Sequence, residues 1–266
     1  MVKRLVFLRL FILSMAYAHA QKSLPPNRIE KLSGKESWAV FVNNKYFTTL
    51  LQTRSVKKPV LFPLHSASGY TVTRGFPLEP RANERIDHPH HVGVWFNHGA
   101  VNSYDFWNNS DDIGKEHPGP FGKILLKDVY DIKNGKSATE MTSRSEWVNE
   151  DGIVLLEEIT HYRFYEQGKR RFIERNSTLK ALGDTVHIKD NKEGMFAMRL
   201  CRELEQPYDK AELLTDDKGI KMSVPSINNK GVSGNYLNDN KLEGDSVWGK
   251  PARWVAVRGK ISNQKV

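Results

Sequence analysis

FGKILLKDVYDI (121–132) opens a series of four β-rich runs; the others are SATEMTSRSEWV (137–148), IVLLEEITHYRFYE (153–166) and RRFIERNSTLKAL (170–182). Polar and apolar residues alternate along these runs, which is the two-residue period of a strand with one buried face. Each run is separated from the next by a turn that contains glycine, at Gly135, Gly152 and Gly168. The series predicts an antiparallel meander of four strands.

Further strands are expected on both sides of the meander. Two apolar runs in SWAVFVNNKYFTTLL (37–51) flank Asn43 and Asn44, and asparagine tolerates the left-handed backbone of a tight hairpin turn. Helical periodicity is almost absent from the chain. We therefore expect an all-β fold, a large antiparallel two-sheet β-sandwich, as a single domain over residues 37–266 that follows a lead-in segment at 21–36.

The first twenty residues have the features of a secretory signal peptide. A basic start precedes a short apolar run, and the small-x-small motif Ala18-His19-Ala20 predicts cleavage near Ala20. We expect a periplasmic or secreted mature protein. The apolar run is too short to span a bilayer, and no later stretch is apolar for long enough, so stable membrane insertion is not expected.

Charge and cysteine content narrow the classes of partner. The chain of 266 residues has a formal charge of +9, but its Lys and Arg residues are spread among acids, as in KRRFIERNSTLK (169–180). No basic stripe interleaved with aromatic residues is evident, so a nucleic-acid partner is not expected.

Cys201 is the only cysteine. An intramolecular disulfide is therefore impossible, and we interpret Cys201 as a core residue.

Histidines concentrate in DHPHHVGVWFNHGAVNSYDFW (87–107), which holds four of the nine in the chain. Imidazole shuttles protons near neutral pH and also binds transition metals. Three interpretations stay open: acid–base or hydrogen-bonding chemistry, a metal site, and imidazoles that only satisfy buried backbone groups. No recognised zinc spacing is present, and we assign no metal ligand. The candidate catalytic residues are His88, His90 and His91, with Glu193 as the candidate carboxylate base.

Aromatic and polar side chains around these histidines indicate a sugar-binding surface. An aromatic face packs against the C–H face of a sugar ring, while nearby polar groups bind its hydroxyls; plain core packing is the alternative for these rings. Strand alternation places His98 on the same face as Val94 and Phe96, so His98 is structural if that face is the core. The candidate substrate-binding residues are Arg85, His98, Asp105, Trp107 and Arg199.

Three segments together resemble a bacterial family labelled methane oxygenase PmoA-like. They are KPVLFPLHSASGYTVTRGFP (58–77), DHPHHVGVWFNHGAVNSYDFW (87–107) and KEGMFAMRL (192–200), within a resemblance that covers roughly residues 40–258. The resemblance implies an exported protein of bacteria that degrade polysaccharides. It also implies a sandwich similar to the galactose mutarotase-like supersandwich. In mutarotases a His acid and a Glu base open and close the sugar ring, so the resemblance implies a His/carboxylate pair.

Members of that family usually continue past the last strand with another segment containing His-Pro and Arg. The chain ends at Val266, so we expect a shortened version that lacks a strand or site residues.

The sequence leaves three functions open. The first is an enzyme, a sugar epimerase, lyase or hydrolase, that uses His/carboxylate acid–base chemistry and requires no cofactor. The second is a non-catalytic carbohydrate-binding protein. The third is a metal-dependent oxygenase, as the family label suggests. The partner expected in the first two is a carbohydrate or a small glycoside.

Overall fold

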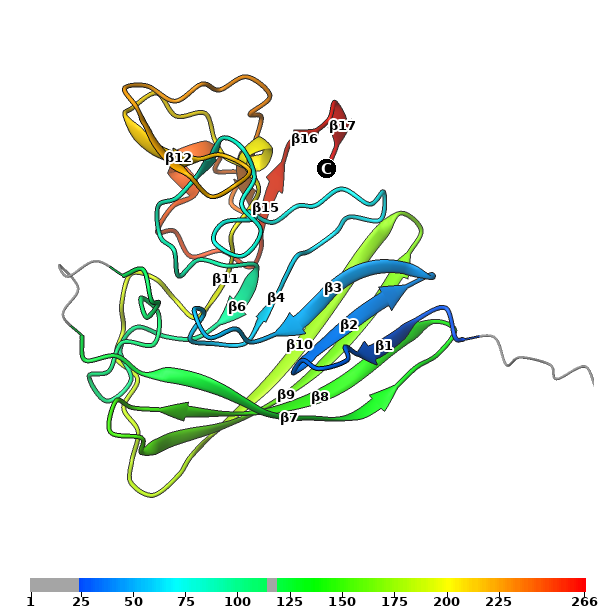
Figure 1. Ribbon diagram of the computed structural model, residues 1–266, viewed down its shortest axis with the longest axis vertical. Coiled ribbons are helices and arrows are strands. Elements are labelled where there is room, and N and C mark those ends of the chain that lie inside the picture. Colours follow the sequence, from blue (N-terminus) through cyan, green and yellow to red (C-terminus); the bar gives the residue numbers. More distant parts are fainter. Residues whose placement is uncertain (1–23, 114–118) are drawn as a thin grey trace, which may run out of the picture.

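The predicted meander forms a four-stranded antiparallel sheet in the computed structural model (Figure 1). The structure describes residues 24–113 and 119–266, so the predicted signal peptide lies outside the described residues. The strands lie side by side in the order β10-β9-β8-β7. Each strand begins and ends within two residues of its predicted range, so the meander is confirmed. Their bounds are β7 (Lys123–Lys133), β8 (Ala138–Val148), β9 (Val154–Gln167) and β10 (Arg170–Ala181).

The two faces of the meander differ in the way that the alternation predicts. On β8 and β9, Met141, Tyr162 and Phe164 are buried. The opposite face carries ion pairs in solvent, such as Arg144 with Asp128 at 2.7 Å. One face therefore packs against the rest of the protein, while the other is solvated.

A second antiparallel sheet has six strands in the order β1-β2-β3-β4-β6-β11. Asn43 and Asn44 join β2 to β3 with φ angles of 51° and 60°, which confirms the predicted hairpin turn. The sheet begins earlier than predicted, because β1 lies within the expected lead-in and pairs with β2. The bounds are β1 (Arg28–Lys31), β2 (Ser37–Val42), β3 (Lys45–Leu51), β4 (Val60–Leu61), β6 (Val94–Phe96) and β11 (Phe196–Met198).

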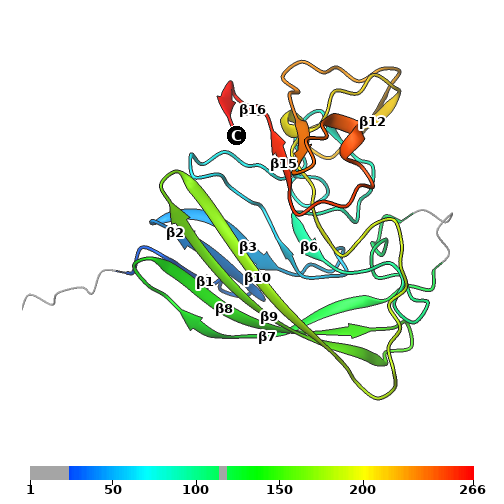
Figure 2. The ribbon, with the colours of Figure 1, turned by 180° about the vertical axis from the view of Figure 1, so that it is seen from behind.

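The two sheets pack face to face as an all-β sandwich, seen from the opposite side in Figure 2. Trp38, Val40 and Phe47 of the six-stranded sheet share one buried cluster with Met141 and Phe164 of the meander. The rings of Phe47 and Phe164 meet edge to face, with 6.2 Å between their centroids. Apolar burial between the sheets is the main stabilising contribution to this architecture. The predicted β-sandwich is confirmed.

Short elements, most of them late in the chain, form a further layer on the side of the six-stranded sheet that faces away from the meander (Figures 1 and 2). No α-helix occurs in the described residues, and no helix there is long and apolar enough to cross a membrane. The elements are β5 (Glu84–Arg85), β12 (Glu212–Thr215), β13 (Lys221–Val224), β14 (Asn235–Asn238), β15 (Val255–Arg258), β16 (Lys260–Ile261), β17 (Gln264–Lys265) and the 3₁₀ helices η1 (Arg202–Leu204) and η2 (Gly244–Val247).

Strand β6 lies between the sandwich core and this further layer. Its alternating side chains divide between the two sides: Val94 belongs to the main core cluster, whereas Trp95 packs in a separate cluster. The chain enters β6 through Gly93, where φ is +60° and a Cβ would lie 2.3 Å from the carbonyl oxygen of Leu61. Only glycine tolerates both conditions, so Gly93 lets the histidine-rich segment lie directly against the sheet.

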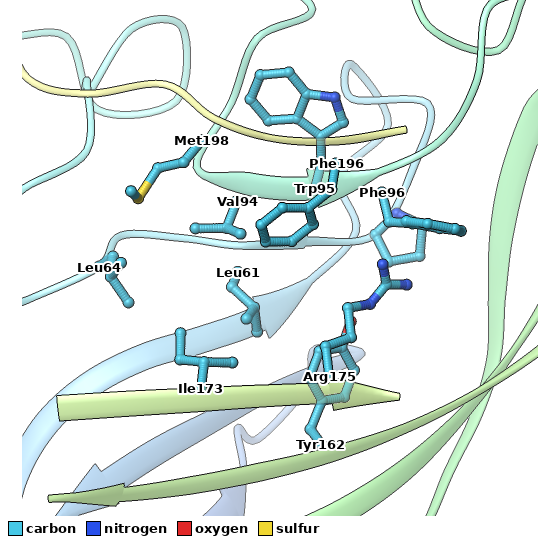
Figure 3. A pocket seen from close by; sticks show the side chains of 11 residues that line it. Leu61, Leu64, Val94, Trp95, Phe96, Tyr162, Ile173, Arg175, Phe196 and Met198 are labelled. Atoms are coloured by element: carbon cyan, nitrogen blue, oxygen red, sulfur yellow. The ribbon is translucent and has the colours of Figure 1, made fainter. Parts of the chain in front are cut away.

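An apolar cavity of about 170 Å³, which we call the inter-sheet cavity, lies on the core side of β6. Figure 3 shows Val94, Leu61 and Phe196 facing Ile173 of β10 across it. Its charged wall residue, Arg175, forms an ion pair with Glu158 and a further hydrogen bond to the hydroxyl of Thr160. The guanidinium also lies 4.3 Å from the centroid of the Phe96 ring, a distance typical of a cation–π contact.

Candidate functional site

A polar cleft of about 610 Å³ lies on the other side of β6, between this strand, β11 and the late elements of the chain. Nine of the residues that line it carry a charged, imidazole or aromatic side chain. We call these nine the residues of the polar cleft. They are Arg85, Arg199, Glu205, Asp245, His91, Trp95, Tyr208, Tyr236 and Trp248. Three of the residues proposed from the sequence, Arg85, His91 and Arg199, therefore meet in one cleft although they come from distant segments.

The segment 87–91 is folded around the guanidinium of Arg74, which is fully buried. Arg74 donates hydrogen bonds to the carbonyl oxygens of Asp87, His88 and His91 at 2.7–3.0 Å. These bonds satisfy carbonyl groups that an irregular loop leaves without ladder partners. The positions of the histidines are thus set by an arginine that precedes them by more than a dozen residues.

The carboxylate of Asp87 links Arg74 to the polar cleft. Its Oδ1 accepts hydrogen bonds from Arg74 at 3.1 Å and from Arg199 at 2.6 Å, and its Oδ2 accepts one from His88 Nδ1 at 2.7 Å. Burial alone would raise the pKa of Asp87, but the His88 bond and the neighbouring arginines hold it well below its usual range. Asp87 is therefore ionised at neutral pH and holds Arg199 at the wall of the cleft.

Lys58 supports the same loop through its backbone carbonyl groups. Its side chain is buried, and its Nζ donates to the carbonyl oxygens of His90 at 2.8 Å and Trp107 at 3.5 Å. Burial lowers the pKa of Lys58 to about 7. The ammonium also lies 5.3 Å from the Trp95 ring centroid. Lys58 joins the histidine segment to the segment that carries Trp107.

The three candidate histidines have different surroundings. The side chain of His88 is 55% exposed, and its ring stacks on that of His91 with centroids 4.8 Å apart. His90 is buried, 4.4 Å from the His91 ring centroid. His91 lines the cleft, and its Nε2 accepts a hydrogen bond from Trp107 Nε1 at 3.1 Å.

His91 is held as a neutral imidazole with a defined tautomer. Burial, followed by the charges of His90 and His88, lowers its pKa far below the usual range. Because Nε2 accepts the bond from the Trp107 indole, the proton of the neutral ring resides on Nδ1. The Nδ1–H is therefore the hydrogen-bond donor that the neutral His91 ring can offer.

Glu205, at the C-terminal end of η1, places a largely buried carboxylate in the cleft. It accepts hydrogen bonds from Arg202 at 2.9 Å and from Arg199 at 3.4 Å. Burial raises the pKa of Glu205, and the nearby arginines only partly offset this effect. A carboxyl group whose pKa is raised by burial in a cleft is a candidate general acid–base.

Arg85 contributes a second cation to the cleft. Its Nε donates to Glu212 at 2.8 Å, and its guanidinium lies 4.8 Å from the centroid of the Tyr208 ring. An arginine held on one side by a carboxylate and on the other by an aromatic ring has little rotational freedom. Arg85 is thus positioned as a rigid donor at the wall of the cleft.

The remaining predicted residues lie outside the set that lines the cleft. Trp107 is buried and orients His91. Asp105 accepts hydrogen bonds from the backbone N–H groups of Trp107 and Asn108 at 2.8 and 3.0 Å, as a turn-capping residue does.

His98 is buried and accepts a hydrogen bond from the Ala100 N–H, and burial lowers the pKa of His98. Glu193 pairs with Lys192 at 3.3 Å in the turn before β11. Their proposed direct roles stay predictions.

The histidine segment does not have the arrangement of a three-ligand metal centre. Within residues 24–113 and 119–266, no three His, Cys, Asp or Glu side chains form a group that could hold a metal ion. The Nε2 of His91 is occupied by the Trp107 indole, and the Nδ1 of His88 by Asp87. These two nitrogens therefore point to different hydrogen-bond partners. This arrangement does not fit a pair of ligands that share one metal ion.

A model of the family DUF6807, described as a family of unknown function, matches residues 37–266 of the chain. The chain belongs to this family. The searches of curated proteins and of solved structures returned no match. The expected membership of a family of unknown function is thus confirmed, and the PmoA-like label stays a prediction. The activity of this DUF6807 protein has to be inferred from its cleft.

Much of the cleft of this DUF6807 protein comes from residues that sequence reasoning missed. Glu205, Tyr208, Tyr236, Asp245 and Trp248 lie more than a hundred positions after the histidines, in segments after residue 204 where the sequence suggested no candidate site residue. The structure shows strands β12 and β14 within those segments. The available signal was the placement of Trp248 and Tyr236 in otherwise polar loops, because an aromatic residue in such a loop often contacts a ligand.

Glycine allows these late segments to approach the cleft. A Cβ at Gly234 would lie 1.9 Å from the carbonyl oxygen of Leu204. The absence of a side chain therefore lets the strand that carries Tyr236 pack against η1, next to Glu205.

Proposed function

We propose that this protein binds a carbohydrate in the polar cleft and carries out proton-transfer chemistry on it. Epimerisation and cleavage by a lyase or hydrolase reaction are the classes that fit a base and a hydrogen-bond donor. The observation that carries the proposal is a buried carboxyl group, Glu205, with a raised pKa in a cleft walled by four aromatic rings and two arginines. Such a combination of a few convergent polar groups with apolar walls is typical of a small-molecule site.

The aromatic side chains support a sugar as the ligand. Tyr208, Tyr236 and Trp248 offer aromatic rings, and Arg85 and Arg199 offer N–H donors beside them. A sugar ring presents C–H groups on its faces and hydroxyl groups around its edge. Aromatic faces and guanidinium groups complement these two surfaces at the same time.

The proposed catalytic roles follow from protonation states. Glu205 serves as the general acid–base, because it lines the cleft and burial raises its pKa above the ordinary value of a glutamate. His91 stays neutral and donates its Nδ1–H to a sugar oxygen, stabilising negative charge that develops there. This differs from a histidine that donates its proton outright, since the imidazolium form of His91 is strongly disfavoured.

Location and family resemblance belong to the same proposal. We infer an exported protein, periplasmic or secreted, from the signal peptide that the first twenty residues predict. The resemblance to the PmoA-like family and to galactose mutarotase-like sandwiches is consistent with a His/carboxylate pair that acts on a sugar. The carboxylate in the proposal is Glu205, which lines the cleft, in place of Glu193.

A non-catalytic carbohydrate-binding protein is the second candidate. The favouring observation is that Arg85 and Arg199 are already tied to carboxylates, through Glu212 and Asp87. Such pairs fix the shape of a cleft without leaving a free reactive charge.

The test is a panel of neutral sugars and oligosaccharides offered to purified wild type and to Glu205→Gln, with binding measured by calorimetry and turnover by product analysis. Gln keeps the shape of Glu but cannot exchange a proton. We expect binding within about tenfold of wild type and turnover lower by at least about 100-fold.

The matched control is Glu203→Gln, on the same 3₁₀ helix but outside the set of residues that line the cleft. It should retain both binding and turnover. Turnover that survives in Glu205→Gln would remove Glu205 from the mechanism. Binding without turnover by any form would favour the binding protein, and the absence of sugar binding by wild type would overturn the proposal.

A further inference from the structure

A second cavity, which we call the distal pocket, adjoins the polar cleft and has a volume of about 530 Å³. Gln206, Tyr236, Asp245 and Trp248 line both cavities. Because the same side chains form walls of both, the polar cleft and the distal pocket are adjacent, and we call the two together the groove. Each part alone falls within the volume range of a small-molecule site.

The two parts of the groove differ in chemistry. The polar cleft holds Arg85, Arg199, Glu205 and His91, whereas the distal pocket adds Val247 and Val255 to the shared residues. Among the described residues that line the distal pocket, Asp245 is the one that carries a charge at neutral pH, and its carboxylate accepts a hydrogen bond from Gln206 at 2.6 Å. A ligand group in the distal pocket therefore meets aromatic and aliphatic surface together with a single charged group, the carboxylate of Asp245.

Trp248 stands at the junction of the two parts with 77% of its surface exposed. Its backbone is nevertheless held in place, because its N–H bonds to the carbonyl of Asp245 at 3.1 Å and the preceding Val247 is buried. Exposure of a large aromatic ring on an anchored backbone leaves apolar area that a bound ligand can cover. An exposed indole on an anchored backbone offers a face on which a ring that enters the groove can stack.

We propose that the groove takes a carbohydrate of at least two rings. The reacting ring occupies the polar cleft, and the next ring stacks on Trp248 in the distal pocket. The second ring is a neutral sugar, because the carboxylate of Asp245 would repel a uronic acid there. This inference rests on the proposed function, since it names the class of substrate for the same site.

The experiment compares monosaccharides with disaccharides by calorimetry on the full protein. The probes are glucose, galactose, mannose and xylose, the neutral disaccharides built from them, and the matching disaccharides with a uronic acid. We expect wild type to bind one neutral disaccharide about tenfold more tightly than its component monosaccharide, which is the gain of one aromatic stacking contact. The uronic acid disaccharide should show no such gain.

Two tryptophan variants test this stacking contact. Trp248→Ala should abolish the advantage of the disaccharide, because it should lower disaccharide affinity by about tenfold more than it lowers monosaccharide affinity. Trp254→Ala is the matched control, because Trp254 is also exposed but lines neither part of the groove. It should bind both sugars as wild type does.

The outcomes separate this inference from the proposed function. Equal affinity of wild type for monosaccharides and disaccharides would overturn the two-ring inference and leave the proposed function intact. The same is true of equal losses in Trp248→Ala and Trp254→Ala. Failure of wild type to bind any probe would overturn the proposed function itself.

Discussion

The inter-sheet cavity and the polar cleft lie on the two sides of strand β6, yet they are built in opposite ways. Leu61, Val94 and Ile173 wall the inter-sheet cavity, and its Arg175 is paired with Glu158 (Figure 3). The polar cleft instead brings several charged groups to its surface. The comparison teaches that a cavity becomes a candidate site when polar groups converge on accessible volume, and that apolar volume alone can be imperfect packing between two sheets.

Replacement of Asp87 by Ala should give the largest effect, because it acts on the charges that hold the cleft together. The change leaves the buried guanidinium of Arg74 and the side chain of Arg199 without their shared carboxylate. We expect the free energy of unfolding to fall by about 3–5 kcal/mol. Urea denaturation measures it.

Asp128→Ala provides the control for that change, since Asp128 pairs with Arg144 on the solvated face of the meander. Its cost should be at most about 1 kcal/mol. Equal losses in the two variants would mean that the Asp87 network is no more important for stability than a surface ion pair.

Replacement of Leu61 by Ala tests the other side of β6. Leu61 is 3% exposed and lines the inter-sheet cavity. Its truncation enlarges that cavity and should lower the free energy of unfolding by about 3 kcal/mol. The affinity for sugar should not change, because the polar cleft keeps its residues. A loss of sugar affinity in a correctly folded Leu61→Ala protein would contradict the separation of the two cavities.

The smallest expected effect is the pH dependence that His91 contributes. Burial lowers its pKa in the folded protein, so below about pH 6.5 the unfolded chain binds a proton that the folded chain does not. Stability therefore falls as the pH decreases through this range. Between pH 7.5 and 5.5, wild type should lose about 1.4 kcal/mol that His91→Gln does not lose.

Parallel denaturant titrations of wild type and His91→Gln at the two pH values measure this difference. His65 and His98, whose pKa values are also lowered, contribute equally to both proteins and cancel. Identical pH profiles would show that His91 is not held neutral in the folded state.

The fold was largely predictable from the sequence, because its strands are long and their pattern is local. The alternation of polar and apolar residues in 121–182 predicts a sheet with one buried face, and Asn43 and Asn44 predict a hairpin turn. Two strands of four residues, β12 and β14, escaped prediction. A short strand contains too few residues to establish a period, and pairing partners far away in the chain decide whether it forms.

The candidate site was predictable only in part. Arg85, His91 and Arg199 stood out because ionisable and aromatic residues are dense around them, and the structure brings them to one cleft. Glu205 could not be selected from the other acids, since its value as an acid–base group comes from burial that later segments provide. Trp107 and His98 look the same in sequence as residues that contact a ligand, but tertiary packing turns both of them inward.

By itself, the sequence determined the all-β class, the meander and the segment around which the cleft is built. Those features depend on neighbours within a few positions, where the period of side chains and the chemistry of turns act directly. The tertiary structure alone decided which side of β6 is apolar and which is polar, because the meander covers one side and Glu205, Tyr236 and Trp248 cover the other (Figures 1 and 2). Protonation of the site follows from that division, since burial by distant segments sets the pKa values of His91 and Glu205.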